Sequence, residues 1–196
     1  MEHKPRLGCV VMAAGIARRF GTNKLSAQWE GKSLIRRAME AIPTEMYRRR
    51  VVVTQYPEII DLAKEFSFTP IENTHPDLGI SHTVALGLAA LADCDAVLFQ
   101  VSDQPLLRRE TVAELTEFYL SRPDRIAALS HGGVRGNPCI FPARFFPELL
   151  ELSGDRGGSA VIKRHPEALV LWESDAGQLA DVDTPTALKA LRQSQT

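Results

Sequence analysis

The chain has 196 residues, of which 44% are hydrophobic and 24% are charged, values typical of one globular domain over residues 1–196. Its 23 Lys and Arg residues nearly balance its 24 Asp and Glu residues, so the net charge is −1. Because no overall field attracts nucleic acid or anionic lipid, we expect neither nucleic acid nor a membrane as a partner, and any anion must be bound by a local cluster.

Strand-like apolar runs alternate with helical patterns along the chain. In chain order they are a strand at 7–14, a helix at 33–42, a strand at 51–56, helices at 57–66 and 81–92, a strand at 96–101, a helix at 110–120, strands at 126–130 and 137–142, helices at 143–152 and 159–165, a strand at 168–172 and a helix at 184–193. Ser33, Ser81 and Thr184 are suited to cap their helices. The alternation predicts a three-layer α/β/α arrangement around a mostly parallel sheet, with ligands at the carboxyl ends of the strands.

The three cysteines, Cys9, Cys94 and Cys139, form neither a CxxC pair nor a zinc-binding spacing. Unpaired thiols are typical of a reducing compartment. The apolar stretch near the amino end is too short to span a membrane, and a signal-peptide cleavage site is not evident. The sequence therefore predicts a cytoplasmic protein.

The segment at residues 13–24, after the first expected strand, combines small residues with cations. Small residues let a ligand approach the backbone N–H groups, and cations neutralise a polyphosphate. The residues of these two kinds are Ala13, Ala14, Gly15, Arg18, Arg19 and Lys24. A turn with a solvated basic face would show the same pattern. The spacing excludes a P-loop, GxxxxGK[ST], and the GxGxxG of dinucleotide-binding oxidoreductases is absent.

This segment resembles the signature of the MobA-like nucleotidyltransferases, L-A-A/G-G-x-S-x-R-x-G-x-x-K. Gly15, Arg19, Gly21 and Lys24 fall in register, whereas Ala17 stands where the family usually has serine. The resemblance implies a Rossmann-like nucleotidyltransferase fold and a loop that wraps a triphosphate, with Arg19 and Lys24 neutralising its charge.

The nucleotide base is indicated by the start of the same loop. Guanylyltransferases of the family tend to have AGG there, and cytidylyltransferases tend to have AAG. This chain has Ala13-Ala14-Gly15, and Asn23-Lys24-Leu25 also matches the variant of the molybdenum cofactor cytidylyltransferases. The resemblance therefore favours CTP over GTP.

Two aspartates are candidate metal ligands. Asp103 follows the strand at 96–101, where a carboxylate can hold a hard cation, although it could also cap a turn or a helix. The family has D-x-P here as its magnesium aspartate, so the resemblance implies Mg²⁺ as cofactor. Asp183, in the segment Asp-Val-Asp-Thr-Pro, is a second candidate ligand or a helix-capping residue, and Asp181 is a weaker one.

A third part of the expected nucleotide site lies before the helix at 81–92. Residues 79–83 (Gly-Ile-Ser-His-Thr) resemble the family's G-M-S-S-S segment, with Gly79 and Ser81 matching directly. The N–H groups at the start of a helix can hold a phosphate or a ribose oxygen. His82 replaces the central serine and is interpreted as a surface residue.

The acceptor side is indicated by two further segments. Arg135-Gly136-Asn137-Pro138 resembles the G-x-P segment that borders the acceptor in molybdopterin-handling members, although by itself it would be an ordinary turn before an edge strand. Residues 153–162 resemble the family's G-D-x-G-A-R segment, with Asp155 matching and Ser159 in place of the arginine. The implied acceptor-binding residues are Gly136, Asn137, Pro138 and Asp155.

The resemblance extends from residue 8 to about residue 188 and implies attack by an acceptor phosphate on the α-phosphorus of an NTP, with pyrophosphate release. Arg19, Lys24 and Asp103 would be the catalytic residues. The implied partners are an NTP, CTP favoured, and a small phosphorylated acceptor such as molybdopterin; docking to a molybdoenzyme or its chaperone stays open. The alternatives are a GTP-using enzyme, a sugar-phosphate, polyol-phosphate or phospholactate acceptor, and a non-catalytic nucleotide-binding cofactor chaperone.

Overall fold

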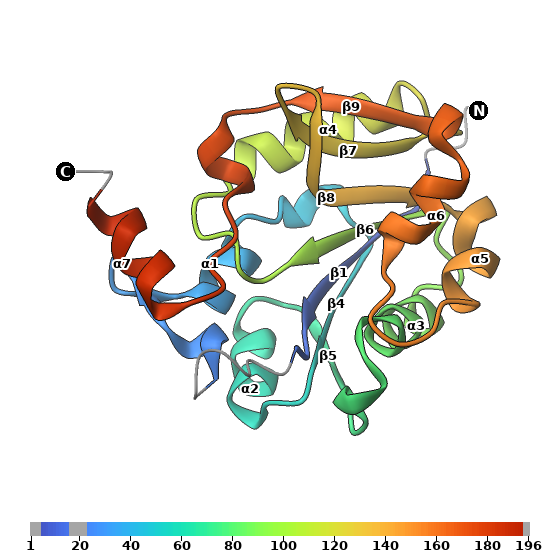
Figure 1. The fold of residues 1–196 in the computed structure, drawn as a ribbon. Coiled ribbons are helices and arrows are strands. Elements are labelled where there is room, and N and C mark those ends of the chain that lie inside the picture. Colours follow the sequence, from blue (N-terminus) through green and yellow to red (C-terminus); the bar gives the residue numbers. More distant parts are fainter. Residues whose placement is uncertain (1–4, 16–22, 194–196) are drawn as a thin grey trace.

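The protein is a three-layer α/β/α molecule in a computed structural model that describes residues 5–15 and 23–193 (Figure 1). Seven strands form one sheet in the order β5-β4-β1-β6-β8-β7-β9. Their bounds are β1 Leu7–Ala13, β4 Arg49–Thr54, β5 Thr69–Glu72, β6 Ala96–Val101, β7 Ile126–His131, β8 Val134–Pro142 and β9 Leu169–Glu173. In this sheet only β8 runs antiparallel to its neighbours, so the predicted mostly parallel α/β fold is confirmed.

Helices cover both faces of the sheet (Figure 1). One face packs against α1 (Leu34–Glu40), α2 (Pro57–Glu65) and α4 (Arg109–Leu120), and the other against α3 (Ile80–Ala90), α5 (Phe146–Leu150) and α6 (Gly158–Arg164). The central strand β1 has apolar side chains on both faces, so both must be covered. Cys9 and Val11 belong to the hydrophobic core on the first face and Val10 to the core on the second. A strand buried on both faces has an uninterrupted apolar sequence, as in the LGCVVMA of β1.

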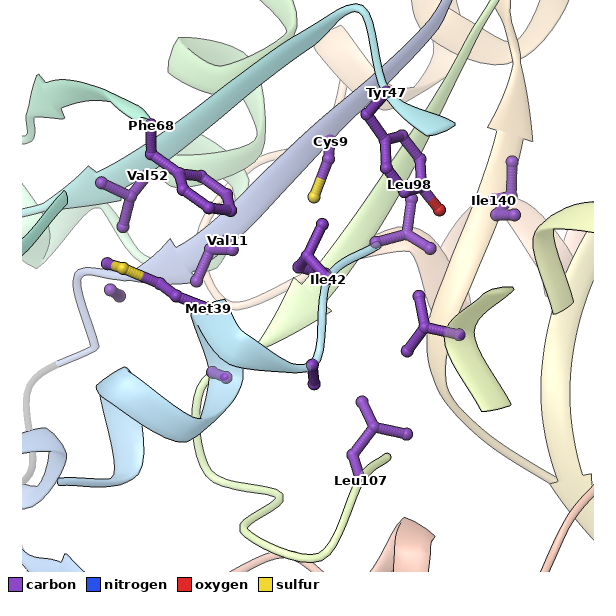
Figure 2. Packing of buried hydrophobic residues seen from close by; sticks show 14 of the residues in the cluster. Cys9, Val11, Met39, Ile42, Tyr47, Val52, Phe68, Leu98, Leu107 and Ile140 are labelled. Carbon is purple, nitrogen blue, oxygen red and sulfur yellow. The ribbon is translucent and has the colours of Figure 1, made fainter. Parts of the chain in front are cut away.

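Figure 2 shows the core on the first face, where Met39 and Ile42 pack toward Val11 and Val52 of the sheet. All four side chains are 1% exposed or less. Burying an aliphatic side chain of this size contributes roughly 1.5–3 kcal/mol, so the central strands are firmly held. The loops at their carboxyl ends therefore start from fixed positions.

Several local predictions are confirmed. The Ser33 hydroxyl accepts a hydrogen bond from Arg36 N at 3.3 Å and caps α1, and Thr184 Oγ1 accepts from Ala187 N at 3.1 Å at the start of α7 (Pro185–Gln193). Ser81 as a cap is wrong. The cap position of α3 is Gly79, whose backbone φ of +83° favours glycine, and Ser81 lies inside the first turn.

Three strands were missed in the sequence, and a fourth was misplaced. β5, TPIE, contains a proline and no apolar alternation, and the two-residue strands β2 (Gln28–Trp29) and β3 (Lys32–Ser33) form a separate hairpin. β8 is not an edge strand but lies between β6 and β7. Its Pro138 is tolerated there because it lies outside both ladders: β6 pairs only with residues 139–142, and the β7 register shifts at this point.

The strand order places β1 between β4 and β6. The chain leaves β1 toward β4 and β5 and then crosses back through α3 to β6 on the other side. Such a switch point opens a crevice at the carboxyl ends of the strands, and there ligands bind in open α/β sheets. No helix in the described residues is long and apolar enough to cross a membrane.

Candidate functional site

A cavity of about 600 Å³ opens at this switch point. Its walls come from the ends of β1 and β6, from the segment before α3, and from two later segments around residues 155 and 183. The lining residues are Met12, Ala14, Gly15, Lys24, Leu25, Pro76, Asp77, Gly79, Ile80, Thr83, Val101, Ser102, Asp103, Asp155 and Asp183. The cavity thus brings together residues that are far apart in the sequence.

The start of the loop after β1 is fixed by the strand beside it. The side chains of residues 54–56 donate in turn to the backbone carbonyls of residues 13–15, with donor–acceptor distances of 3.0, 2.8 and 3.0 Å. Across a trans peptide the next N–H points opposite to the carbonyl, so the bond from Gln55 to Ala14 directs the N–H of Gly15 away from β4. These three polar residues were missed in the sequence, although Thr-Gln-Tyr directly after the Val-Val-Val of β4 is a signal of a ligand-facing strand end.

Gly15 itself has room around it. A Cβ built at this position meets nothing within 4 Å, and the backbone does not require a left-handed conformation there. The fold therefore places no packing demand on this glycine. Open space next to a backbone on the cavity wall is what close approach of a ligand needs.

Lys24 and two aspartates form the polar centre of the cavity. Lys24 Nζ lies 2.8 Å from Asp103 Oδ2 and 3.0 Å from Asp183 Oδ1. The Lys24 and Asp103 side chains are 14% and 23% exposed, whereas Asp183 is 57% exposed. Burial alone would lower the pKa of Lys24, but Asp103 and then Asp183 outweigh it, so the pKa is raised and the ammonium stays charged.

Hydrogen bonds made by these residues and their neighbours hold the three in place. Val182 N donates to Asp103 O at 2.8 Å, which joins the two aspartate-bearing segments. Asn23 caps the short helix η1 (Lys24–Ser26) by accepting from Leu25 N at 3.0 Å, and its Nδ2 donates to Glu58 of α2 at 2.7 Å. Thr184 supplies the capping oxygen of α7, and the Asp183 carboxylate turns instead to Lys24.

A third carboxylate, Asp181, interacts electrostatically with Asp103 and Asp183. Burial and the charge of Asp103 raise the pKa of Asp181 from 3.8 to about 6, against the opposing hydrogen bond from Gln104. Three carboxylates, Asp103, Asp181 and Asp183, therefore surround the single ammonium of Lys24, which leaves a surplus of negative charge.

The donor set fits a hard divalent cation. Carboxylate oxygens are the protein ligands that Mg²⁺ prefers, and Mg²⁺ is usually held by one or two of them plus water and phosphate oxygens. The buried Oδ1 of Asp103 has no hydrogen-bond partner among the described residues. Those residues include no group of three or more His, Cys, Asp or Glu side chains arranged around a metal position. The site therefore suits a cation that shares its coordination with a ligand rather than a closed structural metal.

The start of α3 is occupied by the chain itself. Ser81 N donates to Gly154 O at 3.1 Å, and a Cβ on Gly79 would lie 2.5 Å from the Gly154 backbone and 2.7 Å from Asp155 Oδ1. Close packing against Gly154 and Asp155 thus requires glycine at position 79. The loop at 153–157 closes this wall and carries Asp155 into the cavity.

A second cavity of about 740 Å³ adjoins the first, and the two share Met12, Ile80, Val101 and Asp155 as lining residues. It extends toward β8 and α6, where Arg135 Nη2 donates to Ser159 Oγ at 2.6 Å. Its charged lining residues are Arg135, Glu151, Asp155, Arg156, Lys163 and Arg164. This cavity is rich in cations and is reached from the first one past Asp155.

Comparison with known proteins identifies the family to which this fold and cavity belong. Residues 9–169 match the MobA-like NTP transferase domain. The chain belongs to this family. "Purine catabolism protein PucB" of Bacillus subtilis is 25% identical over 205 residues, 98% of each chain, and a "Probable molybdenum cofactor guanylyltransferase" of the same species is 28% identical over 145 residues, covering 72% of this chain and 70% of that one. The solved structure of Rv0371c from Mycobacterium tuberculosis in complex with manganese superposes with a TM-score of 0.77 at 18% identity, covering 96% of this chain and 99% of the other.

The resemblance read from the sequence is thereby confirmed, and the chain is a nucleotidyltransferase of the MobA-like family. Of the predicted site residues, the structure brings Ala14, Gly15, Lys24, Gly79, Asp103 and Asp183 to the first cavity, Asn137 to the second, and Asp155 to both. Ala13, Ser81, Gly136 and Pro138 line neither cavity, and Gly136 instead packs against Leu179. Ala17, Arg18, Arg19 and Gly21 lie outside the described residues.

Proposed function

We propose that this MobA-like chain is a Mg²⁺-dependent nucleotidyltransferase that moves a nucleoside monophosphate, CMP in preference to GMP, from an NTP to a phosphorylated acceptor, molybdopterin. The observation that carries the proposal is the pairing of Lys24 with Asp103 and Asp183 at the switch point of the sheet. The metal is supported by this donor set and by the manganese bound to Rv0371c. The acceptor is supported by the molybdenum cofactor named for a curated relative.

The two cavities divide the substrates. The first holds the NTP, whose phosphates lie near Gly15 and Lys24, and the second holds the acceptor, whose phosphate faces cations such as Arg135. The shared wall at Asp155 is the place where the two phosphates meet.

The reaction needs no protein nucleophile, because an acceptor phosphate is already ionised at neutral pH. One of its oxygens forms a bond to the α-phosphorus while the bond from that phosphorus to the bridging oxygen of pyrophosphate breaks. Asp103 and Asp183 hold the Mg²⁺, which when bound polarises the α-phosphate and orients the leaving group. Lys24, with Arg19, neutralises the charge that grows on the pyrophosphate, so catalysis rests on positioning and electrostatics.

The preference for CTP rests on Ala13-Ala14-Gly15 and is tested by thermal shift with CTP, GTP, ATP and UTP in the presence of Mg²⁺. We expect the largest stabilisation with CTP, because a ligand that binds only the folded state adds RT ln(1 + [L]/Kd) to the free energy of unfolding and so raises the melting temperature. A shift with GTP alone would instead place the chain with its guanylyltransferase relative.

Pyrophosphate release then tests the transfer itself. With CTP, Mg²⁺ and molybdopterin, we expect pyrophosphate and a molybdopterin–cytidine dinucleotide in equal amounts. A sugar phosphate or polyol phosphate as the working acceptor would correct the substrate. Binding of NTP without pyrophosphate release with any of these acceptors would indicate a non-catalytic cofactor chaperone.

A further inference from the structure

One ammonium group contacts both proposed metal ligands at the same time. Lys24 Nζ lies 2.8 Å from Asp103 Oδ2 and 3.0 Å from Asp183 Oδ1. A divalent cation held by these two carboxylates would need the space that the ammonium takes. The lysine and the metal therefore cannot occupy this position together.

Two of the three side chains in this arrangement are largely shielded from solvent. The side chains of Lys24 and Asp103 are 14% and 23% exposed, so water screens their charges weakly. The remaining oxygen of Asp103, Oδ1, is buried and has no hydrogen-bond partner among the described residues. The contact with Lys24 thus provides a partner for Oδ2 of Asp103 but none for Oδ1. This unpaired oxygen points to a second arrangement, in which a cation binds the carboxylate instead of the lysine.

We propose that Lys24 closes the metal position in the nucleotide-free protein, so that metal and nucleotide bind only with each other's help. A metal that enters must displace the ammonium, and a buried ammonium needs another anion. The triphosphate supplies that anion in the same cavity, and the flexible four-carbon side chain of lysine lets the ammonium move to it. This inference rests on the proposed function for the identity of the two metal ligands.

Reciprocity follows from thermodynamics. If the nucleotide strengthens metal binding by removing Lys24 from the carboxylates, the metal must strengthen nucleotide binding by the same factor. Lys24 would then serve first as a plug of the empty site and afterwards as a phosphate ligand.

The test is a Mn²⁺ titration of the nucleotide-free protein, with free Mn²⁺ measured by electron paramagnetic resonance. We expect Lys24→Met to bind Mn²⁺ at least about tenfold more tightly than wild type, since removal of an adjacent unit charge is worth more than the 1.4 kcal/mol that corresponds to tenfold. Lys32→Met is the matched control: it removes the same charge from an exposed pair with Glu40 and should bind like wild type. Asp103→Asn in the Lys24→Met background should abolish the gain.

The coupling is measured by repeating the titrations with an α,β-methylene analogue of CTP. We expect the analogue to tighten Mn²⁺ binding to wild type several-fold more than to Lys24→Met. If Lys24→Met is unstable, Lys24→Gln keeps hydrogen-bonding capacity, and a larger rise of its melting temperature with Mn²⁺ than that of wild type gives the same answer. Equal Mn²⁺ affinity of wild type and both variants would overturn the inference, even if the enzyme transfers CMP normally. A protein that releases no pyrophosphate but shows the gain would overturn the proposed function alone.

Discussion

The two adjoining cavities have opposite charge. Among the described residues that line the first, Lys24 is the one cation against four aspartates: Asp77, Asp103, Asp155 and Asp183. The second has four cations, Arg135, Arg156, Lys163 and Arg164, against Glu151 and Asp155. An acidic cavity repels a triphosphate unless a divalent cation or the cations of the preceding loop compensate for its carboxylates, whereas the basic cavity can hold a phosphate with its own side chains. The difference suggests that one substrate depends on metal and the other does not.

The largest effect is expected in the acidic cavity, from loss of the proposed metal ligand Asp103. Asp103→Asn keeps the shape of the side chain but removes the charge that holds the cation, so we expect kcat to fall by roughly 10²–10³-fold, the scale of losing one preorganised electrostatic group. The measurement is pyrophosphate release at saturating NTP and Mg²⁺. Asp93→Asn, which removes a carboxylate paired with Arg49 on another part of the molecule, is the control and should stay near wild type. Turnover close to normal in Asp103→Asn would remove the metal assignment.

The second prediction addresses the basic cavity. Arg135 lines it and is oriented by its hydrogen bond to Ser159. Because a hydrogen bond to a charged group contributes about 1.5–3 kcal/mol, Arg135→Gln should raise the acceptor KM by roughly tenfold or more and leave the NTP KM unchanged. Arg122→Gln, an exposed change at the end of α4, is the control. A rise in the NTP KM instead would show that the two cavities do not divide the substrates.

The third prediction contrasts two glycines of the first cavity. Gly79 has a backbone φ of +83° and no room for a Cβ, so Gly79→Ala should lower the free energy of unfolding by about 1–3 kcal/mol. Gly15 has room, so Gly15→Ala should leave stability within about 0.5 kcal/mol and raise the NTP KM several-fold, because the new methyl group points into ligand space. Thermal unfolding and initial rates separate the two effects. A destabilised Gly15→Ala protein with an unchanged KM would mean that this glycine serves the fold.

Much of the first cavity was readable from the sequence because its parts follow strands. Asp103 and the loop at 13–15 lie directly after buried apolar runs, and parallel strands bring their carboxyl ends to one edge. The contacts of Lys24 were not readable, since its partners are 79 and 159 residues away and no local pattern encodes the pairing. The family resemblance predicted that Lys24 contacts phosphate, whereas in the structure its ammonium group contacts the carboxylates of Asp103 and Asp183.

The second cavity was harder to predict. Arg135 comes from β8 and the other three cations from the segment at 156–164, and no local sequence pattern joins these two parts of the chain. The position of β8 was also misjudged, because Pro138 suggests an edge strand and only the register shift opposite it explains a central one. The sequence therefore predicted Asn137 and Asp155 as acceptor-binding residues but did not predict the excess of cations that lines the cavity around them.

The smallest effect is expected from Asp181, the carboxylate next to the acidic first cavity. Burial and Asp103 raise the pKa of Asp181 to about 6 in the folded protein, above 3.8, so the ionised carboxylate destabilises the fold. This penalty is absent below about pH 4, develops between there and pH 6, and is complete above pH 6. In EDTA, Asp181→Asn should therefore raise the melting temperature at pH 7.5 and not at pH 4. The rise should be small because Asp181 as a whole residue is exposed, so solvent reduces both the burial of its carboxyl group and the repulsion from Asp103. Mg²⁺ with NTP should reduce the gain at pH 7.5, since it neutralises Asp103 and Asp183. The same gain at both pH values would mean that the ionised Asp181 carboxylate is not its cause.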